Sequence, residues 1–457
     1  MRLRVAIVGA GPAAFYAADA LLSAEGATCE VDMFERLPAP FGLVRYGVAP
    51  DHQKIKTVTR AFEKTAAHSC FRYFGNVEVG RHVTLAELRT HYHAVLFATG
   101  AQSDRRLNIP GEDLARSRPA TEFVAWYNGH PDYSHLQFDL RQEAVAVVGA
   151  GNVALDVARI LCLSPGELKA SDMAPYAVEA LSHSKVRDVY LLGRRGPAQA
   201  AFTSPEVKEL GELADADIVV RRDEAELDAI SAAELGCSGD RMVEKKVGLI
   251  KGYAERVPAG KKRRLHLRFL VSPTEILDDG SGAAGGIVLT SNTLVRTENG
   301  SISPQPTGET ETIPAGLVFR SVGYRGMEVP GVPFDERWGV IRNDHGRVTD
   351  PATNAAVPGL YTAGWIKRGP SGVIGTNKPD AVETVMALLE DAPELTDNRD
   401  LPPRAAILEV LTNNDGCRPV SFEEWRRIDE AECAAGAAAG RPRVKLCSVA
   451  EMLGVLG

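Results

Sequence analysis

Apolar residues follow the same order at two places in the chain. VAIVGAGPAAFYAADAL at residues 5–21 and VAVVGAGNVALDVARIL at residues 145–161 each begin with a short run of small or β-branched apolar residues. Each run continues through a glycine-rich turn into a stretch with helical periodicity. A short continuous apolar run is typical of a buried parallel strand. Each copy therefore predicts a strand, a tight turn and a helix, in that order.

The turns have the glycine spacing of a dinucleotide-binding fingerprint, G-x-G-x-x-G. In the first copy Gly9 and Gly11 take the first two positions, and Ala14 takes the third, where a small side chain lets helix and strand pack closely. The corresponding residues of the second copy are Gly149, Gly151 and Ala154. Such a turn directs backbone N–H groups and the positive end of the helix dipole at a pyrophosphate. Two copies predict two dinucleotide sites.

The strand after each fingerprint indicates which dinucleotide is bound. CEVDMFER ends in Glu35, about 24 residues after Gly11, which is close to the spacing of a carboxylate that accepts both hydroxyls of an unphosphorylated adenosine ribose. DVYLLGRRG instead ends in Arg194 and Arg195 and carries no acid after the strand. Guanidinium groups bind phosphate in a bidentate manner, so this pair favours NADP over NAD, although a solvated arginine loop is the alternative. The sequence predicts FAD at the first site and NADPH at the second.

Features that suit FAD occur on both sides of the second fingerprint. YHAVLFATGA is a buried strand ending at Gly100, where glycine permits close approach of the first dinucleotide. GVIGTNKPDA, far along the chain, places several N–H groups at the start of a helix. We therefore predict an α/β fold with two Rossmann-like dinucleotide-binding domains, the NADP-binding domain being inserted in the FAD-binding domain. The predicted parts are 1–104 (FAD), 105–325 (NADP) and 326–457 (FAD and a C-terminal tail).

Two segments of the predicted NADP-binding domain carry no nucleotide motif. Residues 241–268 are strongly basic within an acidic chain, which indicates either a solvated surface loop or a docking patch for an acidic partner. Residues 278–310 contain DDGSGAAGG and TENGSISPQPTGE, which predict hairpin turns and a variable loop.

Composition and charge narrow the class of function. The 457 residues suffice for two or more domains, and 52 Lys and Arg against 60 Asp and Glu give a net charge of −8. This negative charge disfavours a protein that binds nucleic acids or membrane surfaces. No apolar run in the sequence has the length of a membrane span, and the N-terminus fits strand, turn and helix better than a secretory signal. A cytoplasmic protein is expected, with a monomer as the default.

The seven cysteines are scattered, and the sequence has no C-x-x-C or C-x4-C pair. Reduced thiols are therefore expected, and a redox-active dithiol or a ferredoxin-type cluster in this chain is excluded. Disulfide reductases with a double fingerprint need such a pair, and flavin monooxygenases carry an F-x-G-x-x-x-H stretch that we do not find. An NADPH diaphorase or quinone reductase, and a redox sensor that only binds the nucleotides, stay open as alternatives.

Five segments together resemble the adrenodoxin reductase family of NADPH-ferredoxin reductases, in particular its bacterial members. They are VRYGVAPDHQ, GAGNVALDVARIL, GRRGPAQAAFTSPEVKEL, TAGWIKRGPSGVIGTNK and RPVSFEEW. The match runs in order over nearly the whole chain, and only residues 235–310 lack a recognisable motif. The resemblance implies a glutathione/adrenodoxin reductase-like fold, non-covalently held FAD, NADPH as electron donor and an iron-sulfur ferredoxin as one-electron acceptor.

The resemblance also implies the residues of the site. The residues assigned to FAD are Ala13, Glu35, Leu43, Val79, Trp365, Gly372, Val373 and Ile374. Those assigned to NADPH are Ala150, Gly151, Asn152, Val153, Arg194, Arg195, Glu206 and again Gly372. His52 and Glu209 match residues that the family places near the nicotinamide and flavin, where a proton relay is the implied role. A purely structural His52 is the alternative.

Overall fold

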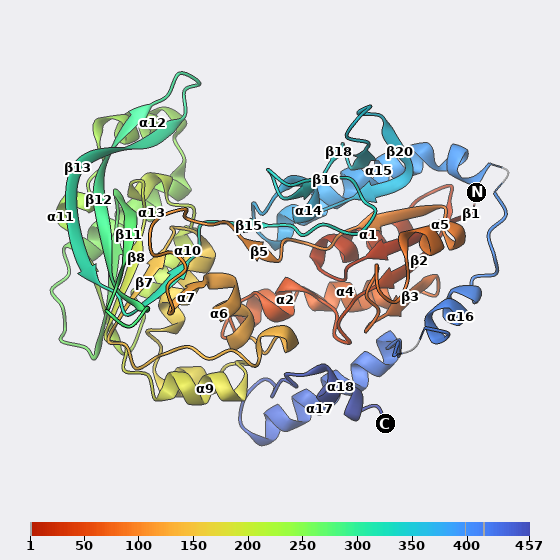
Figure 1. Ribbon diagram of the computed structural model, residues 1–457, viewed down its shortest axis with the longest axis horizontal. Coiled ribbons are helices and arrows are strands. Elements are labelled where there is room, and N and C mark those ends of the chain that lie inside the picture. The colour runs from red at the N-terminus through yellow and green to blue at the C-terminus, as the bar shows by residue number, and fades with distance from the viewer. Residues whose placement is uncertain (1, 398, 415) are drawn as a thin grey trace. The chain divides into compact units, whose positions relative to one another are not determined.

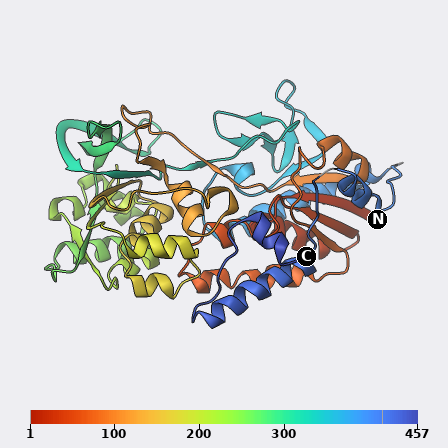
Figure 2. The ribbon, with the colours of Figure 1, turned by 60° about the horizontal axis from the view of Figure 1, so that its bottom comes forward.

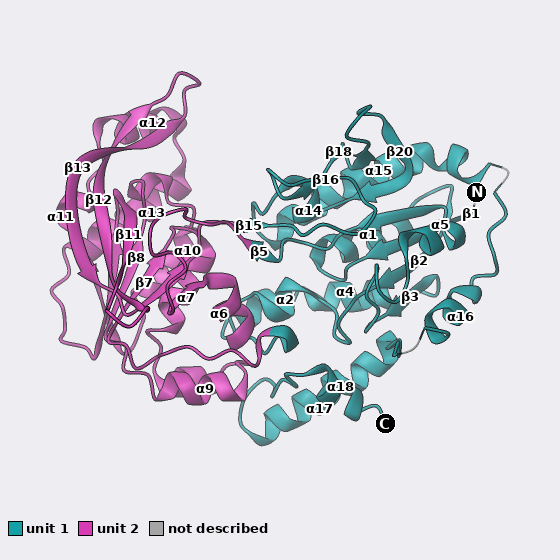
Figure 3. Ribbon diagram, in the orientation of Figure 1, with its two compact units in different colours: residues 1–103, 128–132, 324–457 teal, residues 104–127, 133–323 magenta. Residues whose placement is uncertain are grey.

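The computed structural model describes residues 2–397, 399–414 and 416–457 (Figure 1). The chain divides into two compact units (Figure 3). The first consists of residues 1–103, 128–132 and 324–457, and the second of residues 104–127 and 133–323. The second unit is thus inserted in the first, as the sequence predicts. The short return of residues 128–132 to the first unit was not predicted.

The first unit is built on a seven-stranded sheet with the order β18-β19-β20-β4-β1-β2-β3. The strands are β1 (Arg2–Val8), β2 (Thr28–Phe34), β3 (Phe71–Phe74), β4 (Ala94–Phe97), β18 (Asn343–Asp344), β19 (Arg347–Thr349) and β20 (Ala356–Thr362). β1 pairs in parallel with both β2 and β4, so the turn that follows it lies at the middle of the sheet edge. The antiparallel strands β18 and β19 extend the sheet beyond β20.

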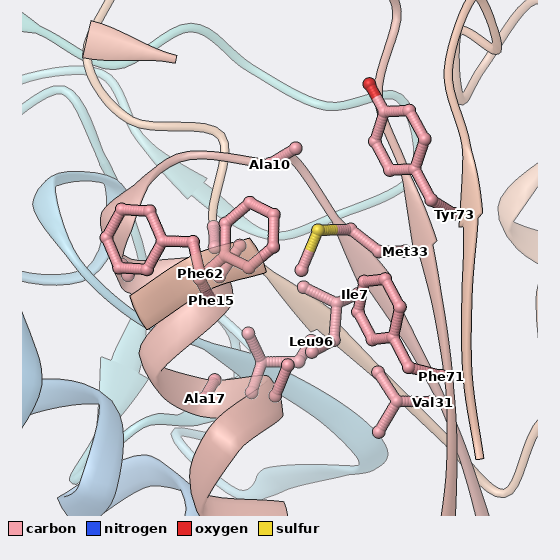
Figure 4. Packing of buried hydrophobic residues seen from close by; sticks show 14 of the residues in the cluster. Ile7, Ala10, Phe15, Ala17, Val31, Met33, Phe62, Phe71, Tyr73 and Leu96 are labelled. Atoms are coloured by element: carbon pink, nitrogen blue, oxygen red, sulfur yellow. The ribbon is translucent and has the colours of Figure 1, made fainter. Parts of the chain in front are cut away.

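Helices cover both faces of this sheet. α1 (Pro12–Leu22), α4 (Thr59–Ala66), α15 (Asn377–Thr396), α17 (Phe422–Ala438) and α18 (Val449–Gly454) contribute to one core. α17 and α18 come from the C-terminal tail (Figure 2). Figure 4 shows this core, in which Phe15 of α1 stacks on Phe62 of α4 above Ile7 and Leu96 of the sheet. α5 (Leu85–His91) and α16 (Ala406–Thr412) pack on the opposite face.

The second unit has a six-stranded parallel sheet with the order β6-β14-β7-β8-β10-β9. Its strands are β6 (Ser117–Pro119), β7 (Ala144–Val148), β8 (Asp188–Leu192), β9 (Ala216–Val220), β10 (Arg263–Arg268) and β14 (Leu317–Arg320). Its helices are α6 (Ala120–Tyr127), α7 (Asn152–Ile160), α8 (Pro165–Lys169), α9 (Pro175–Ser182), α10 (Ser204–Leu210), α11 (Arg222–Ala225), α12 (Ala229–Ser238) and α13 (Arg241–Ala254). β7 lies between β14 and β8, as β1 lies between β4 and β2 in the first unit.

The variable loop expected over 278–310 is instead part of a three-stranded antiparallel sheet. β11 (Val271–Asp278), β12 (Ala284–Arg296) and β13 (Ile302–Pro314) form it, and the predicted turns join its strands. One face is apolar because Ile276, Ile287 and Leu289 pack on Val148 and Leu192 of the parallel sheet. The expectation of a loop was wrong, since the exposed face and the many Gly and Pro residues hide the alternation of apolar positions.

Candidate functional site

The first glycine-rich turn joins β1 to α1 and fits tightly between two strand ends. Gly9 has a φ of +104°, and a Cβ on it would lie 2.5 Å from the carbonyl oxygen of Ala98, just beyond β4. Its N–H donates to the carbonyl of Phe34, the last residue of β2, at 2.8 Å. Only glycine combines this backbone conformation with this approach, which accounts for the first glycine of the fingerprint.

Gly11 faces open space in the same turn. A Cβ on it would meet no described atom within 4 Å. Gly11 is the N-cap residue of α1, and no described side chain caps the first N–H groups of that helix. Gly42, with a φ of +46°, brings the following Pro- and Gly-rich segment close to Gly11. An uncapped helix start beside open space suits the pyrophosphate of a dinucleotide.

Glu35 follows β2 and accepts hydrogen bonds from the backbone around the turn. Its Oε2 accepts the N–H of Ala10 at 3.0 Å, and its Oε1 accepts the N–H of Leu37 at 3.2 Å. Burial raises the pKa of the Glu35 carboxyl, and these N–H groups oppose the rise. A carboxylate has about four lone-pair sites, so both oxygens can still accept hydroxyl protons. The geometry fits the predicted contact of Glu35 with a ribose.

The second glycine-rich turn has the geometry of the first. Gly149 has a φ of +137°, and a Cβ on it would overlap the carbonyl oxygen of Ser321, just beyond β14. Its N–H donates to the carbonyl of Leu192, the last residue of β8, at 2.9 Å. Gly151 is the N-cap residue of α7, without a side-chain cap among the described residues and with open space on its Cβ side. Both turns therefore present an open helix start between parallel strands in the interior of a sheet.

Hydrogen bonds bring several of the predicted NADPH residues together. Asn152 Oδ1 accepts the N–H of Thr203 at 3.0 Å, and Asn152 Nδ2 lies 3.4 Å from Glu206 Oε1. The carbonyl of Ala150 accepts the N–H of Ala201 at 2.7 Å. The start of α10 thus lies against the second turn. Val153 follows Asn152 in the first turn of α7 and is half-buried.

Arg194 and Arg195 follow β8 as Glu35 follows β2. Arg194 is exposed and Arg195 is half-buried. No carboxylate of the described residues forms an ion pair with either guanidinium. Desolvation and the charge of Arg194 lower the pKa of Arg195, but a guanidinium stays charged at neutral pH. Two adjacent cations without a protein anion suit a phosphate group.

Comparison with known proteins shows to which family the chain belongs. Residues 3–196 match the family described as pyridine nucleotide-disulphide oxidoreductase. NADPH-ferredoxin reductase FprA of Mycobacterium tuberculosis is 47% identical over 458 residues, which cover 98% of each protein. This chain belongs to the NADPH-ferredoxin reductase family. Human mitochondrial NADPH:adrenodoxin oxidoreductase is 40% identical over 99% of this chain and 92% of that protein. The solved structure of M. tuberculosis FprA in complex with NADPH matches over 100% of both chains, with a TM-score of 0.94 and 45% identity.

These comparisons confirm the resemblance and the fold class predicted from the sequence. In this reductase the residues assigned to FAD all lie in the first unit. Leu43 is the first residue of α2 (Leu43–Tyr46), and Val79 is half-buried in the chain after β3. Gly100 has a φ of +75° and open space on its Cβ side. Gly372 has a φ of +79°, Val373 is 51% exposed, and Ile374 begins the short helix η3 (Ile374–Thr376) that leads into α15.

Trp365 begins α14 (Trp365–Arg368) and has a fixed ring orientation. Its indole N–H donates to the carbonyl of Ser371 at 3.1 Å, and its ring stacks on Tyr324 with centroids 5.8 Å apart. The preceding Gly364 lies against α1, since a Cβ on it would come within 2.6 Å of the Cβ of Ala13. Sequence reasoning missed Tyr324 and Gly364 as supports of Trp365. The glycine before the tryptophan in TAGW was an available indication for Gly364, whereas no local pattern places Tyr324 beside the tryptophan.

The two residues assigned to a proton relay belong to different units. His52 is half-buried just before α3 (Gln53–Lys56) in the first unit. Glu209 is half-buried in α10 of the second unit. Their joint role stays a prediction.

The basic segment 241–268 forms α13 and β10, which are joined by the mostly exposed residues 255–262 in no helix or strand. Three of its cations are buried and serve the fold: Lys246, Arg263 and Arg268. Lys246 Nζ donates to the carbonyls of Ala198 at 3.2 Å and Ala200 at 2.5 Å, and so holds the chain that follows the arginine pair. The exposed cations of the segment are Arg241, Lys245, Arg256, Lys262 and Arg264, of which Arg264 forms an ion pair with Asp188 at 2.6 Å.

Proposed function

We propose that this reductase transfers a hydride from NADPH to non-covalently held FAD and passes the electrons singly to an iron-sulfur ferredoxin. The observation that carries the proposal is the pair of equivalent glycine turns with different residues behind them. Glu35 behind the first turn can accept the hydroxyls of a free ribose. Arg194 and Arg195 behind the second turn suit a 2′-phosphate. The family to which the chain belongs supports the same donor and acceptor.

The side chains and backbone of this protein bind and orient the two coenzymes. Bound FAD supplies the chemistry, because it can take up a hydride and release electrons one at a time. Gly9 and Gly11 let the backbone approach one pyrophosphate, and Gly149 and Gly151 let it approach the other. Trp365, held by Ser371, offers a flat apolar surface for the flavin ring. These contacts fix orientation, which is the main contribution of the protein to a hydride transfer.

A coupled assay tests the proposal against its alternatives. NADPH, a [2Fe-2S] ferredoxin and cytochrome c are mixed with the reductase, and cytochrome c reduction is followed. We expect the rate to depend on ferredoxin and to be far lower with NADH. Rapid reduction of quinones or dyes with no stimulation by ferredoxin would favour a diaphorase, and absence of turnover with every acceptor would favour a nucleotide-binding sensor.

We also propose that the reductase acts as a monomer in the cytoplasm. The apolar residues near the start of the sequence form β1 and α1 and pack in the core of the first unit. None of the helices formed by residues 2–397, 399–414 and 416–457 is long and apolar enough to span a membrane.

Ferredoxin reduction should slow as ionic strength rises. The exposed cations of residues 241–268 can attract an acidic ferredoxin, and salt screens such attraction. We expect a loss of about tenfold between low and high salt, within the range of electrostatic steering. Reduction of menadione, an uncharged quinone, should not change. Lys245→Gln with Lys262→Gln should flatten the salt profile, and Lys169→Gln, at an exposed lysine of α8, should not. A flat profile for the unaltered protein would remove the docking role of this segment.

His52→Ala should slow flavin reduction by NADPH without releasing FAD. Proton transfer by a positioned side chain contributes about 100-fold or more to a rate, so a loss of that order is expected. Stopped-flow absorbance measures the reduction rate, and the ratio of FAD to protein measures binding. His52→Gln, which keeps hydrogen bonding but not basicity, serves as the matched variant. A rate equal to that of the unaltered protein would show that His52 is structural.

A further inference from the structure

The backbone carbonyls of Arg194 and Arg195 accept hydrogen bonds from a later part of the chain, in which the sequence shows no motif. Asn292 Nδ2 donates to the carbonyl of Arg194 at 3.0 Å. The N–H of Leu270 donates to the carbonyl of Arg195 at 3.2 Å. Asn292 lies in β12 and Leu270 directly before β11, so the antiparallel sheet and the residue that leads into it hold the backbone carbonyls of both arginines.

Asn292 lies where β12 departs from regular pairing. The register between β12 and β13 shifts between Thr290 and Asn292, and such irregularities redirect side chains. Asn292 is 5% exposed, and its Nδ2 also donates to Ser272 Oγ at 2.9 Å. Because the carbonyl of Arg194 can only accept, the nitrogen of the amide must face it. The amide is therefore directed at the arginine loop and oriented by Ser272.

The fold gains little from having an amide at this position. Asn292 Oδ1 is buried with no hydrogen-bond partner among the described residues. A buried polar atom without a partner costs free energy, and an apolar side chain of the same shape would avoid that cost. What the amide provides is a nitrogen that donates to the carbonyl of Arg194 and to Ser272 Oγ. Compared with an apolar side chain, the amide of Asn292 therefore serves the loop that carries Arg194 and Arg195 rather than the stability of the sheet.

Leu270 completes the arrangement with a backbone conformation that is rare for its residue type. Its φ is +56°, in the left-handed region that a leucine seldom adopts. In this conformation its N–H reaches Arg195, while its carbonyl accepts the N–H of Asn292 at 2.7 Å. Strained residues of this kind cluster at functional sites because the surrounding structure must hold them.

We propose that Asn292 is a positioning residue for coenzyme selection, which holds the Arg194 carbonyl so that both guanidinium groups are in place before the 2′-phosphate of NADPH arrives. The inference rests on the proposed function of the arginine pair. Two adjacent cations repel each other, and no described carboxylate pairs with either of them. Fixing their backbone in advance lowers the entropy lost when the phosphate binds. The coenzyme class it selects is a 2′-phosphorylated adenine dinucleotide.

Asn292→Leu tests this role, with adenosine 2′-monophosphate and adenosine 5′-monophosphate as competing probes. We expect the KM for NADPH and the inhibition constant of the 2′-monophosphate each to rise about tenfold, as for the loss of one hydrogen bond to a loop. The KM for NADH, the kcat, the FAD content and the inhibition constant of the 5′-monophosphate should not change. Ser272→Ala removes only the hydroxyl that orients the amide, so it should raise the KM for NADPH and the inhibition constant of the 2′-monophosphate by less. It replaces Asn292→Leu as the test if that variant does not fold.

Matched variants separate the inference from the function on which it rests. Thr290→Val removes a hydroxyl of the same strand that donates to the carbonyl of Glu309, and should leave the preference for NADPH intact. If Arg194→Ala weakens binding of the 2′-monophosphate but Asn292→Leu and Ser272→Ala do not, the inference is overturned and the arginine site stands. If Arg194→Ala also has no effect, the arginine site fails and the inference fails with it. Equal losses with NADPH and NADH in Asn292→Leu would show a merely structural role.

Discussion

Replacing Arg194 and Arg195 together by alanine is expected to raise the KM for NADPH by about 100-fold or more and to leave that for NADH nearly unchanged. Each charge-assisted hydrogen bond to a phosphate is worth about 1.5–3 kcal/mol, and two such contacts are lost. Because neither arginine forms an ion pair with a described carboxylate, their removal leaves no unpaired protein charge behind. The effect should therefore appear in coenzyme binding rather than in folding.

Steady-state kinetics with both coenzymes measure this effect. Arg187→Ala is the matched control, because Arg187 is an exposed arginine just before β8, at the end of the strand opposite to the pair. It should change neither KM. Equal losses with NADPH and NADH in the double variant would show that the pair does not read the 2′-phosphate.

Gly11→Ala is expected to lose FAD while the protein stays folded. The φ of Gly11 is −83°, which alanine adopts without strain, and its Cβ would meet no described atom within 4 Å. Where alanine fits the backbone without strain, a Gly-to-Ala change stabilises a fold by about 0.4–1 kcal/mol, because it restricts the unfolded chain. The added methyl group would occupy the space in which we place the pyrophosphate. We expect FAD affinity to fall by about 100-fold or more, since the backbone could no longer approach the phosphates.

The ratio of FAD to protein measures the expected loss of FAD, and thermal unfolding of the apoprotein measures whether the fold is kept. Gly236→Ala is the control: it lies in α12 of the second unit, also with open space around its Cβ, and should keep full FAD content. Gly9→Ala should differ from Gly11→Ala, because its Cβ would collide with the backbone of Ala98 and disturb folding. Normal FAD content in Gly11→Ala would place the pyrophosphate elsewhere.

The sequence could predict what is encoded locally. A strand, a glycine turn and a helix follow one another within about 20 residues, so both nucleotide turns were accessible from the pattern alone. The inserted arrangement followed from the features that suit FAD on both sides of the second turn. Gly9 and Gly149 carry the positive φ values that the fingerprint requires. The roles of the individual site residues, including His52 and Glu209, stay predictions.

The supports of the site depend on contacts between distant residues, which no local pattern reveals. Asn292 and Arg194 are 98 residues apart, and Lys246 holds the carbonyl of Ala200 across 46 residues. Lys246 stands in a run of charges that resembles a solvated surface, yet it is buried. The antiparallel sheet escaped prediction because β13 is exposed along most of its length and shows little apolar alternation.

An anaerobic titration followed by visible absorbance tests the central claim most directly. The purified protein is titrated with NADPH and then mixed at low salt with an oxidised [2Fe-2S] ferredoxin. We predict that the flavin absorbance falls with about one equivalent of NADPH and returns as about two equivalents of ferredoxin are reduced, because a hydride carries two electrons and a cluster accepts one. Absorbance that falls but returns only on addition of oxygen or a quinone would contradict the ferredoxin reductase function.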